Sequence, residues 1–163
     1  MNMKIKEKSH RLPKEFYKGE VSIAFTLCLK EGIQAFKDKE IVNVFTAMLT
    51  YASIKRDCIV PVYCFMPDHQ HLVITGNKIN SDIWKTIVSY KQKTGFWMSK
   101  NKIGIKWQKD FYDHVIRTHE DLASQVKYIL DNPVRKGLVT SWQEHTFKGS
   151  IGCDLEDILR GII

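Results

Sequence analysis

Apolar residues along this chain form short strand-like runs that alternate with longer segments of helical spacing. Residues 21–29 (VSIAFTLCL) and 58–66 (CIVPVYCFM) are rich in β-branched and aromatic side chains, which favour strands. Pro61 has no N–H to donate to a strand ladder, so it indicates an edge or a bulge within the second run. The predicted strands, in chain order, are residues 21–29, 58–66, 70–75 and 105–117.

Three longer segments place apolar residues at spacings of three and four, the period of an amphipathic helix. Ser81 is expected to cap the second helix, and Gly95 to weaken its end. Thr118 is expected to cap the third helix, with Asp121 placed as in a capping box, and Pro133 to end it. The predicted helices are residues 39–56, 81–99 and 119–131, with a short helix near residues 155–160.

The order of these elements is β-α-β-β-α-β followed by a further helix. This order predicts an α+β fold with a ferredoxin-like antiparallel sheet, helices on one face, and an additional helix over residues 119–131. The chain has 163 residues and shows no repeat or Pro/Gly-rich linker. We therefore expect one domain over residues 1–163, with a core at about 20–140 and a C-terminal loop and short helix at 141–163.

Composition narrows the class of protein. An apolar fraction of 44% is enough for a hydrophobic core. No run of about 18 apolar residues predicts a membrane-spanning helix, and Met1 to His10 lack the apolar stretch of a secretory signal. The expectation is an intracellular protein that does not act at a membrane. The four cysteines show no C-x-x-C spacing, so we expect buried, reduced thiols rather than a zinc site.

The net charge of +7 is concentrated in one segment. Residues 83–109 contain no acidic residue, seven lysines and five aromatic residues. Cations bind phosphates and aromatic rings can stack on unpaired bases, so the segment is a candidate nucleic-acid surface. The alternative is a solvated lysine face above a core of aromatic side chains. The candidate DNA-binding residues within the segment are Lys85, Lys91, Lys93, Trp97, Lys100 and Lys102.

His69 and His71 are separated by one residue, just after a predicted tight turn at Pro67-Asp68. Along a strand, residues i and i+2 point to the same side, so the two imidazoles should project from one face. That arrangement suits a divalent metal. The alternative is a pair of surface or hydrogen-bonded histidines, and a metal would need a third ligand from elsewhere in the fold.

The helix predicted over residues 119–131 carries a tyrosine away from its apolar stripe. Leu122, Val126 and Ile129 cluster on one side, whereas Tyr128 lies about 120° from the centre of that stripe. Asn132 follows Tyr128 by four positions and faces the same way. A phenol and an amide oxygen could meet the histidine pair here. The alternative is a tyrosine at a helix–sheet boundary with its hydroxyl in water.

Three segments together resemble a known family. Residues 65–72 (FMPDHQHL) resemble the MPNHVHLL-like signature of single-tyrosine HUH transposases. Residues 107–117 (WQKDFYDHVIR) and 128–138 (YILDNPVRKGL) are similar to two further segments of that family, in the same order. The subgroup that is closest in pattern is the REP-associated tyrosine transposases, and the resemblance covers roughly residues 20–140.

The resemblance implies a role for each matching residue. His69 and His71 match the metal-binding histidines, Tyr128 matches the catalytic tyrosine, and Asn132 matches the polar residue that completes the metal shell in relatives. His114 matches a recurrent histidine that supports the site or takes part in catalysis. Tyr90 and Tyr112 match no catalytic position. Further residues expected to bind DNA are Arg117, Arg135 and Lys136. Asp68 replaces the more usual Asn or Glu and is expected to matter little, because it leads into the strand.

The implied activity is cleavage and rejoining of single-stranded or hairpin DNA through a 5′-phosphotyrosine link, with Mg²⁺ or Mn²⁺ as the cofactor. The resemblance implies a cytoplasmic protein that associates with the nucleoid when bound to DNA. It leaves open a monomer or a homodimer, and whether Tyr128 acts in its own chain. Two rival classes remain: an inert or domesticated DNA-binding module, and a metal-dependent nuclease in which water attacks.

Overall fold

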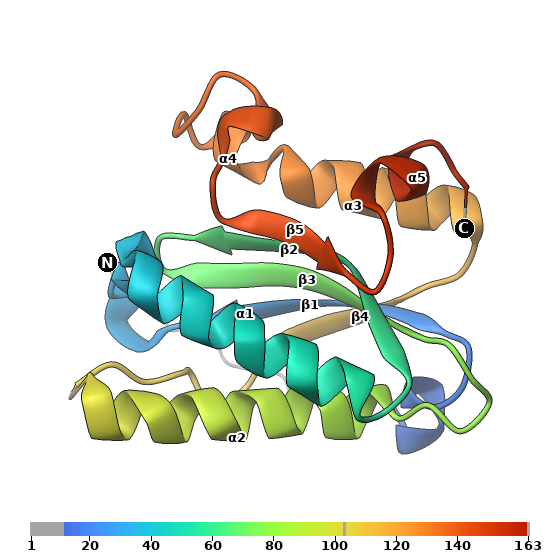
Figure 1. Ribbon diagram of the computed structural model, residues 1–163, viewed down its shortest axis with the longest axis horizontal. Helices are drawn as coiled ribbons and strands as arrows, with labels where there is room; N and C mark the ends of the chain where they lie inside the picture. Colours follow the sequence, from blue (N-terminus) through green and yellow to red (C-terminus); the bar gives the residue numbers. More distant parts are fainter. Residues whose placement is uncertain (1–11, 103, 163) are drawn as a thin grey trace, which may run out of the picture.

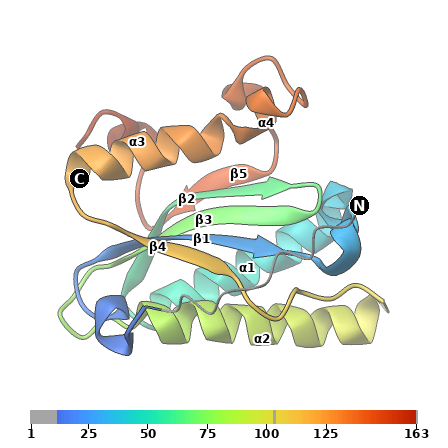
Figure 2. The same cartoon turned by 180° about the vertical axis from the view of Figure 1, so that it is seen from behind.

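The computed structural model describes residues 12–102 and 104–162, and a five-stranded antiparallel sheet is its centre. The strand order across the sheet is β4-β1-β3-β2-β5, so β4 and β5 are the two edges (Figure 2). The strands are β1 (Ser22–Cys28), β2 (Cys58–Met66), β3 (His69–Gly76), β4 (Tyr112–Ile116) and β5 (Lys148–Ile151).

Helices cover both faces of this sheet (Figure 1). On one face lie α1 (Lys39–Ile54) and α2 (Ile83–Asn101), which also pack against each other. On the other face lie α3 (His119–Leu130), the short α4 (Asn132–Arg135) and α5 (Leu155–Leu159). Short 3-10 helices occur at Lys14–Tyr17, Lys30–Gly32, Ala35–Lys37 and Trp142–Glu144. The predicted α+β fold is confirmed, with the tyrosine-bearing α3 on the face opposite the other two long helices.

Two hydrophobic cores explain this three-layer arrangement. The larger core joins the sheet to α1 and α2 and contains the buried rings of Phe36, Phe45 and Tyr90. The smaller core joins the other face to α3 and α5, through residues such as Val73 and Val126. The central strands are apolar on both faces, so each face must be covered by a helix.

Besides the short helix α4 and the 3-10 helices, which were not predicted, the predicted elements differ from the observed ones in three places. The strand predicted over 105–117 begins only at Tyr112, because the preceding segment instead inserts Trp107 into the larger core. Helix α2 continues past Gly95 to Asn101, and Asp82 rather than Ser81 caps it by accepting from the Lys85 N–H. β5 was not predicted, since its sequence KGSI is short and mostly polar.

Other predictions are confirmed. Thr118 caps α3 by accepting from the Asp121 N–H, and the β2 ladder shifts register between Ile59 and Val62, around Pro61. The four cysteines are free, but Cys28 and Cys153 are only half-buried. Among the residues that the structure describes, no helix is long and apolar enough to cross a membrane.

Candidate functional site

Strand β3 sends its side chains alternately to the two helical layers. Gln70 points toward α2, where it is completely buried and accepts a hydrogen bond of 2.6 Å from the Tyr90 hydroxyl. His69 and His71 therefore project to the opposite face, as does Val73 in the α3 core. The prediction that the two imidazoles share one face is consistent with this alternation.

The two imidazoles converge through the same ring nitrogen. His69 Nε2 and His71 Nε2 are 3.1 Å apart, and the ring planes are perpendicular. His69 Nδ1 is 2.6 Å from Asp68 Oδ1, and His71 Nδ1 is 3.0 Å from Thr26 Oγ1. If each Nδ1–H donates to its oxygen partner, both Nε2 lone pairs remain free to bind an ion. Asp68 thus contacts His69 directly, in addition to leading into the strand.

Burial also favours the metal-binding form of His71. Burial first, and then the neighbouring His69 and Arg135, lower the pKa of His71 to about 4. The ring is consequently neutral at physiological pH. A neutral imidazole can donate a lone pair to a metal, whereas an imidazolium cannot.

The spacing of the pair fits an octahedral ion. Two ligand atoms at about 2.1 Å from an ion and at right angles to each other lie about 3.0 Å apart, close to the observed 3.1 Å between the Nε2 atoms. Among the described residues, no group of three or more His, Cys, Asp or Glu side chains could hold an ion. Within the described part of the chain, a further protein ligand at this pair would therefore be of another residue type.

Tyr128 lies in the last turn of α3 and faces outward. Leu122, Val126 and Ile129 are buried in the smaller core, whereas the Tyr128 side chain is 57% exposed. The Arg135 guanidinium lies over its ring, 4.0 Å from the ring centroid. The sequence-based expectation that Tyr128 is outside the apolar stripe is therefore met.

Asn132 begins α4 and is buried, with 8% of its surface exposed. Its Oδ1 accepts a bond of 2.6 Å from Arg135, which also donates to the Tyr128 carbonyl at 2.9 Å. The Asn132 Nδ2 atom is buried without a hydrogen-bond partner. Arg135 thus contacts Tyr128 and Asn132 while its charge acts on His71. The end of α3 and α4 lie above the end of the sheet where β3 begins (Figure 1).

The other candidate residues near this face are exposed. His114 lies on β4 opposite Ala24 of β1, and Ala24 in turn lies opposite Val73 of β3. His114 is therefore in the row of Val73, two residues along β3 from His71. Together with Arg117 it lines an open groove of about 890 Å³ beside the edge of the sheet. Lys136 follows α4 and is exposed. His114 is therefore on the histidine face but not beside the histidine pair.

The basic segment lies on the other side of the sheet, because α2 packs with α1. Its aromatic rings mostly belong to the core: Tyr90 is fully buried, Trp107 is 8% exposed, and Trp97 packs edge-on against Phe45. Only Phe96 among these rings is largely exposed. The structure thus favours the alternative of lysines above a core of aromatic side chains, and the rings that were expected to stack on bases are mostly unavailable.

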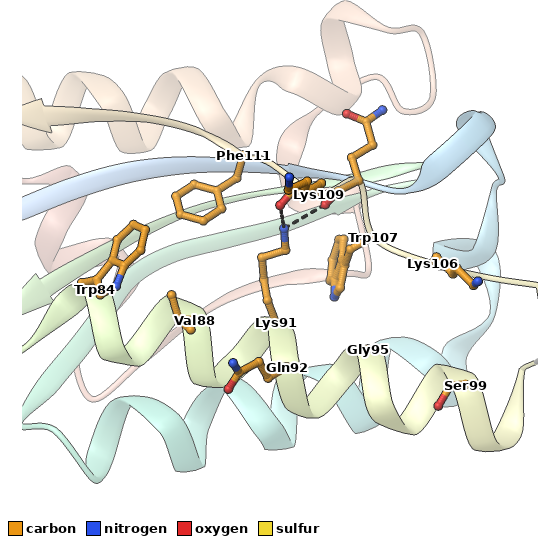
Figure 3. Close-up of a pocket in the computed structure, with 11 residues that line it drawn as sticks. Trp84, Val88, Lys91, Gln92, Gly95, Ser99, Lys106, Trp107, Lys109 and Phe111 are labelled. Atoms are coloured by element: carbon orange, nitrogen blue, oxygen red, sulfur yellow. Dashed lines mark hydrogen bonds between the residues drawn. The ribbon is translucent and has the colours of Figure 1, made fainter. Parts of the chain in front are cut away.

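Several lysines of α2 are engaged within the protein. Lys91 donates to the carbonyls of Gln108 and Lys109, between the rings of Trp107 and Phe111 (Figure 3). Lys102 pairs with Asp38 and Glu40. Lys93 lies 4.1 Å above the Tyr51 ring, and Lys100 lies 5.5 Å above the Phe96 ring. Lys85 is exposed. None of these α2 lysines faces the histidine side of the sheet.

Thr26 is a contributor to the site that sequence reasoning missed. It is a polar residue in an apolar strand, and this is the only local signal of a special role. Its position beside His71 depends on the pairing of β1 with β3, which places Thr26 opposite His71. The sequence contains no local indication of that register.

Comparison with known proteins agrees with the geometry. The family described as "Transposase IS200 like" matches residues 17–132. A REP-associated tyrosine transposase of Escherichia coli K12 is 32% identical over 125 residues, covering 71% of this chain and 68% of that protein. A relative in Haemophilus influenzae is 25% identical over 158 residues, covering 87% of this chain and 88% of its own length.

A solved structure has the same fold. It is described as a REP-associated tyrosine transposase bound to a REP hairpin, and it matches with a TM-score of 0.73 at 21% identity. The match covers 94% of this chain and 87% of the other.

Proposed function

Because the chain belongs to the IS200-like transposase family, we propose that it cleaves and rejoins single-stranded DNA with Tyr128 as the nucleophile. The observation that carries this proposal is the convergence of His69 Nε2 and His71 Nε2, on the face reached by the end of α3. Arg135 links the end of α3 to the histidine pair: it contacts both Tyr128 and Asn132, and its charge lowers the pKa of His71.

The proposed reaction exchanges one phosphate ester for another. The Tyr128 hydroxyl attacks phosphorus, a bond forms between its oxygen and phosphorus, and the bond to the 3′-oxygen breaks. The tyrosine proton leaves, and the departing 3′-oxygen takes up a proton to become a free hydroxyl. The product is a 5′-phosphotyrosine link, which a 3′-hydroxyl can later attack to restore the DNA without ATP.

The residues of the site have separate tasks in this reaction. His69 and His71 would hold a Mg²⁺ or Mn²⁺ ion, which when bound neutralises charge on the phosphate oxygens. Asp68 and Thr26, which contact the two Nδ1 atoms, would hold the rings in the required tautomer. Arg135 is placed to bind a phosphate beside Tyr128, since a guanidinium can pair with two phosphate oxygens at once.

Asn132 would serve as a third ligand to the ion. Its Oδ1 accepts one hydrogen bond from Arg135, which competes with an ion for this oxygen. An incoming phosphate provides a stronger partner for the guanidinium than a neutral amide oxygen does. Binding of the DNA strand would then release Asn132 toward the ion.

The proposed substrate is a strand that carries a hairpin, as in the structural neighbour bound to a REP hairpin. Arg117, Arg135 and Lys136 would contact its phosphates on the histidine face, and His114 would support the site from β4. The lysines of α2 would contact DNA only where it passes around the sheet. This activity implies a cytoplasmic protein that associates with the nucleoid while bound to DNA.

We propose further that Tyr128 acts within its own chain. Arg135 contacts Tyr128 and its charge lowers the pKa of His71 in the same chain, which supports a site built from one chain. A homodimer would then contain two independent sites. Mixing His71→Ala with Tyr128→Phe tests this, because a site shared between chains would regain activity in the mixture, and independent sites would not.

A covalent trap tests the function itself. The protein is incubated with 3′-end-labelled, hairpin-bearing single-stranded DNA and Mn²⁺, and is then run on a denaturing gel. We expect a slow protein–DNA band that is absent with Tyr128→Phe, whereas Tyr51→Phe on the opposite face retains it. Free cleavage products that survive Tyr128→Phe would indicate attack by water, and binding without cleavage would indicate an inert module.

A further inference from the structure

An open strip of the histidine face extends from His71 to the edge strand β4. Antiparallel pairing places Thr26 opposite His71 and Tyr112 opposite Thr26. Residues directly opposite each other share a face of the sheet. The contact of 3.0 Å between Thr26 Oγ1 and His71 Nδ1 agrees with this for the first pair. Tyr112, Thr26 and His71 therefore form one row across three strands.

The two directions away from the histidine pair differ in how they are covered. Toward β2, the paired residues Cys64 and Met66 are buried beneath the smaller core. Toward β4, Thr26 is half-buried and Tyr112 is 60% exposed. As far as the described residues go, a DNA strand that lies across the histidine pair can therefore continue along the sheet surface over β1 and β4.

We propose that Tyr112 is a stacking platform for an unpaired DNA base close to the cleaved phosphate. This inference rests on the proposed function, because it takes the histidine pair as the place where the phosphate lies. Neighbouring strands are about 4.8 Å apart, which puts the backbone of Tyr112 about 10 Å from that of His71. A tyrosine side chain at that distance can reach the base beside the cleaved phosphate or the next one.

Tyr112 has the chemistry that this subsite requires. An exposed aromatic ring offers a flat face to any base, and stacking on it is largely independent of base identity. His114 lies two residues further along β4 on the same face, and the open surface continues from there to Arg117. The strip thus combines an aromatic face with a cation for the backbone. On the histidine face, this strip would thus provide the base stacking that the buried rings of α2 cannot provide on theirs.

The test measures binding without cleavage. In a Tyr128→Phe background, fluorescence anisotropy gives the affinity for a hairpin-bearing strand in which each unpaired nucleotide in turn is made abasic. We expect an abasic nucleotide at one position to weaken binding roughly 5-fold to 100-fold. Tyr112→Ala should weaken binding to the intact strand by a similar factor and remove the penalty at that position, while Tyr112→Phe and Tyr112→Trp should retain it.

Tyr51→Ala is the matched control, because Tyr51 is 54% exposed and lies on α1, on the opposite face. The proposal is overturned if Tyr112→Ala keeps the same abasic profile, or if Tyr51→Ala weakens binding as much. It is also overturned if Tyr112→Phe behaves like Tyr112→Ala, because the hydroxyl would then be the important group. The two proposals can fail separately. If the covalent trap gives no protein–DNA band but the abasic profile still depends on Tyr112, the tyrosine chemistry is rejected and the stacking subsite is retained.

Discussion

On the face covered by α1 and α2, the side chains of the sheet are closed into an aromatic core, whereas on the face covered by α3 the beginning of β3 is only partly covered. Strand β3 contributes to both. Gln70 enters the closed face and bonds with Tyr90, and His69 and His71 reach the open face with their Nε2 atoms directed at each other. Successive residues of one strand thus serve packing and the proposed metal site, because the helices cover one face more completely than the other.

The largest expected effect comes from removing a histidine on the open face. His71→Ala should lower the rate of DNA cleavage at least about a thousand-fold, because an ion at the phosphate supplies several kcal/mol. Titration calorimetry should show weakened binding of Mn²⁺. Gln70→Leu, the neighbouring residue on the closed face, is the control and should leave the rate per folded molecule within a few-fold. Equal losses for both variants would contradict the division between the faces.

The next effect concerns stability and belongs to the closed face. Trp107 packs against Phe36, Phe45 and Tyr90 and donates a bond of 2.8 Å to Thr94. Trp107→Ala should lower the free energy of unfolding by about 3–5 kcal/mol, measured by urea denaturation. Binding of Mn²⁺ to the protein that remains folded should be unchanged.

The exposed ring of Phe96 provides the comparison, and Phe96→Ala should change the free energy of unfolding by less than about 0.5 kcal/mol. A Trp107→Ala variant of normal stability would show that the closed face is not the main source of stability.

A smaller effect is expected from the groups that orient the histidines. Asp68→Ala should weaken binding of Mn²⁺ roughly 10-fold to 100-fold, since His69 loses the partner of its Nδ1. Thr26→Val should act in the same direction through His71. Asp121→Ala, an exposed carboxylate on α3, should leave the affinity unchanged and excludes a general effect of charge. Unchanged affinity in Asp68→Ala would mean that the metal does not need this contact.

The smallest effect separates the cations of the two faces. Neutralising Arg135 and Lys136 together should flatten the dependence of DNA affinity on salt by up to about two units of slope. Neutralising Lys93 and Lys100 together, on α2, should change that slope by less than about one unit. The measurement is affinity for single-stranded DNA at several salt concentrations. A larger change for the α2 pair would show that DNA also lies along the closed face.

Much of the site could be predicted from local patterns. Three features depend only on residues that are close in sequence. They are the H-x-H spacing on a strand, the position of Tyr128 beside the apolar stripe of α3, and the cap at Thr118. The edge strand β5 could not be predicted in this way, because its four residues become a strand only through pairing with β2. The predicted start of β4 is too early for a similar reason, since Trp107 packs in the core against rings from distant segments.

The sequence alone is enough to establish the order of the first four strands and the long helices, the shared face of His69 and His71, and the family to which the three ordered segments belong. These features follow from the period of a strand, the period of a helix and the identity of a few residues. Tertiary structure alone decided that the lysines of α2 lie across the sheet from the histidines, that Thr26 holds His71, and that Arg135 contacts both Tyr128 and Asn132. The physical reason is that strand register and the choice of face depend on which distant surfaces are buried together, and no local pattern contains that information.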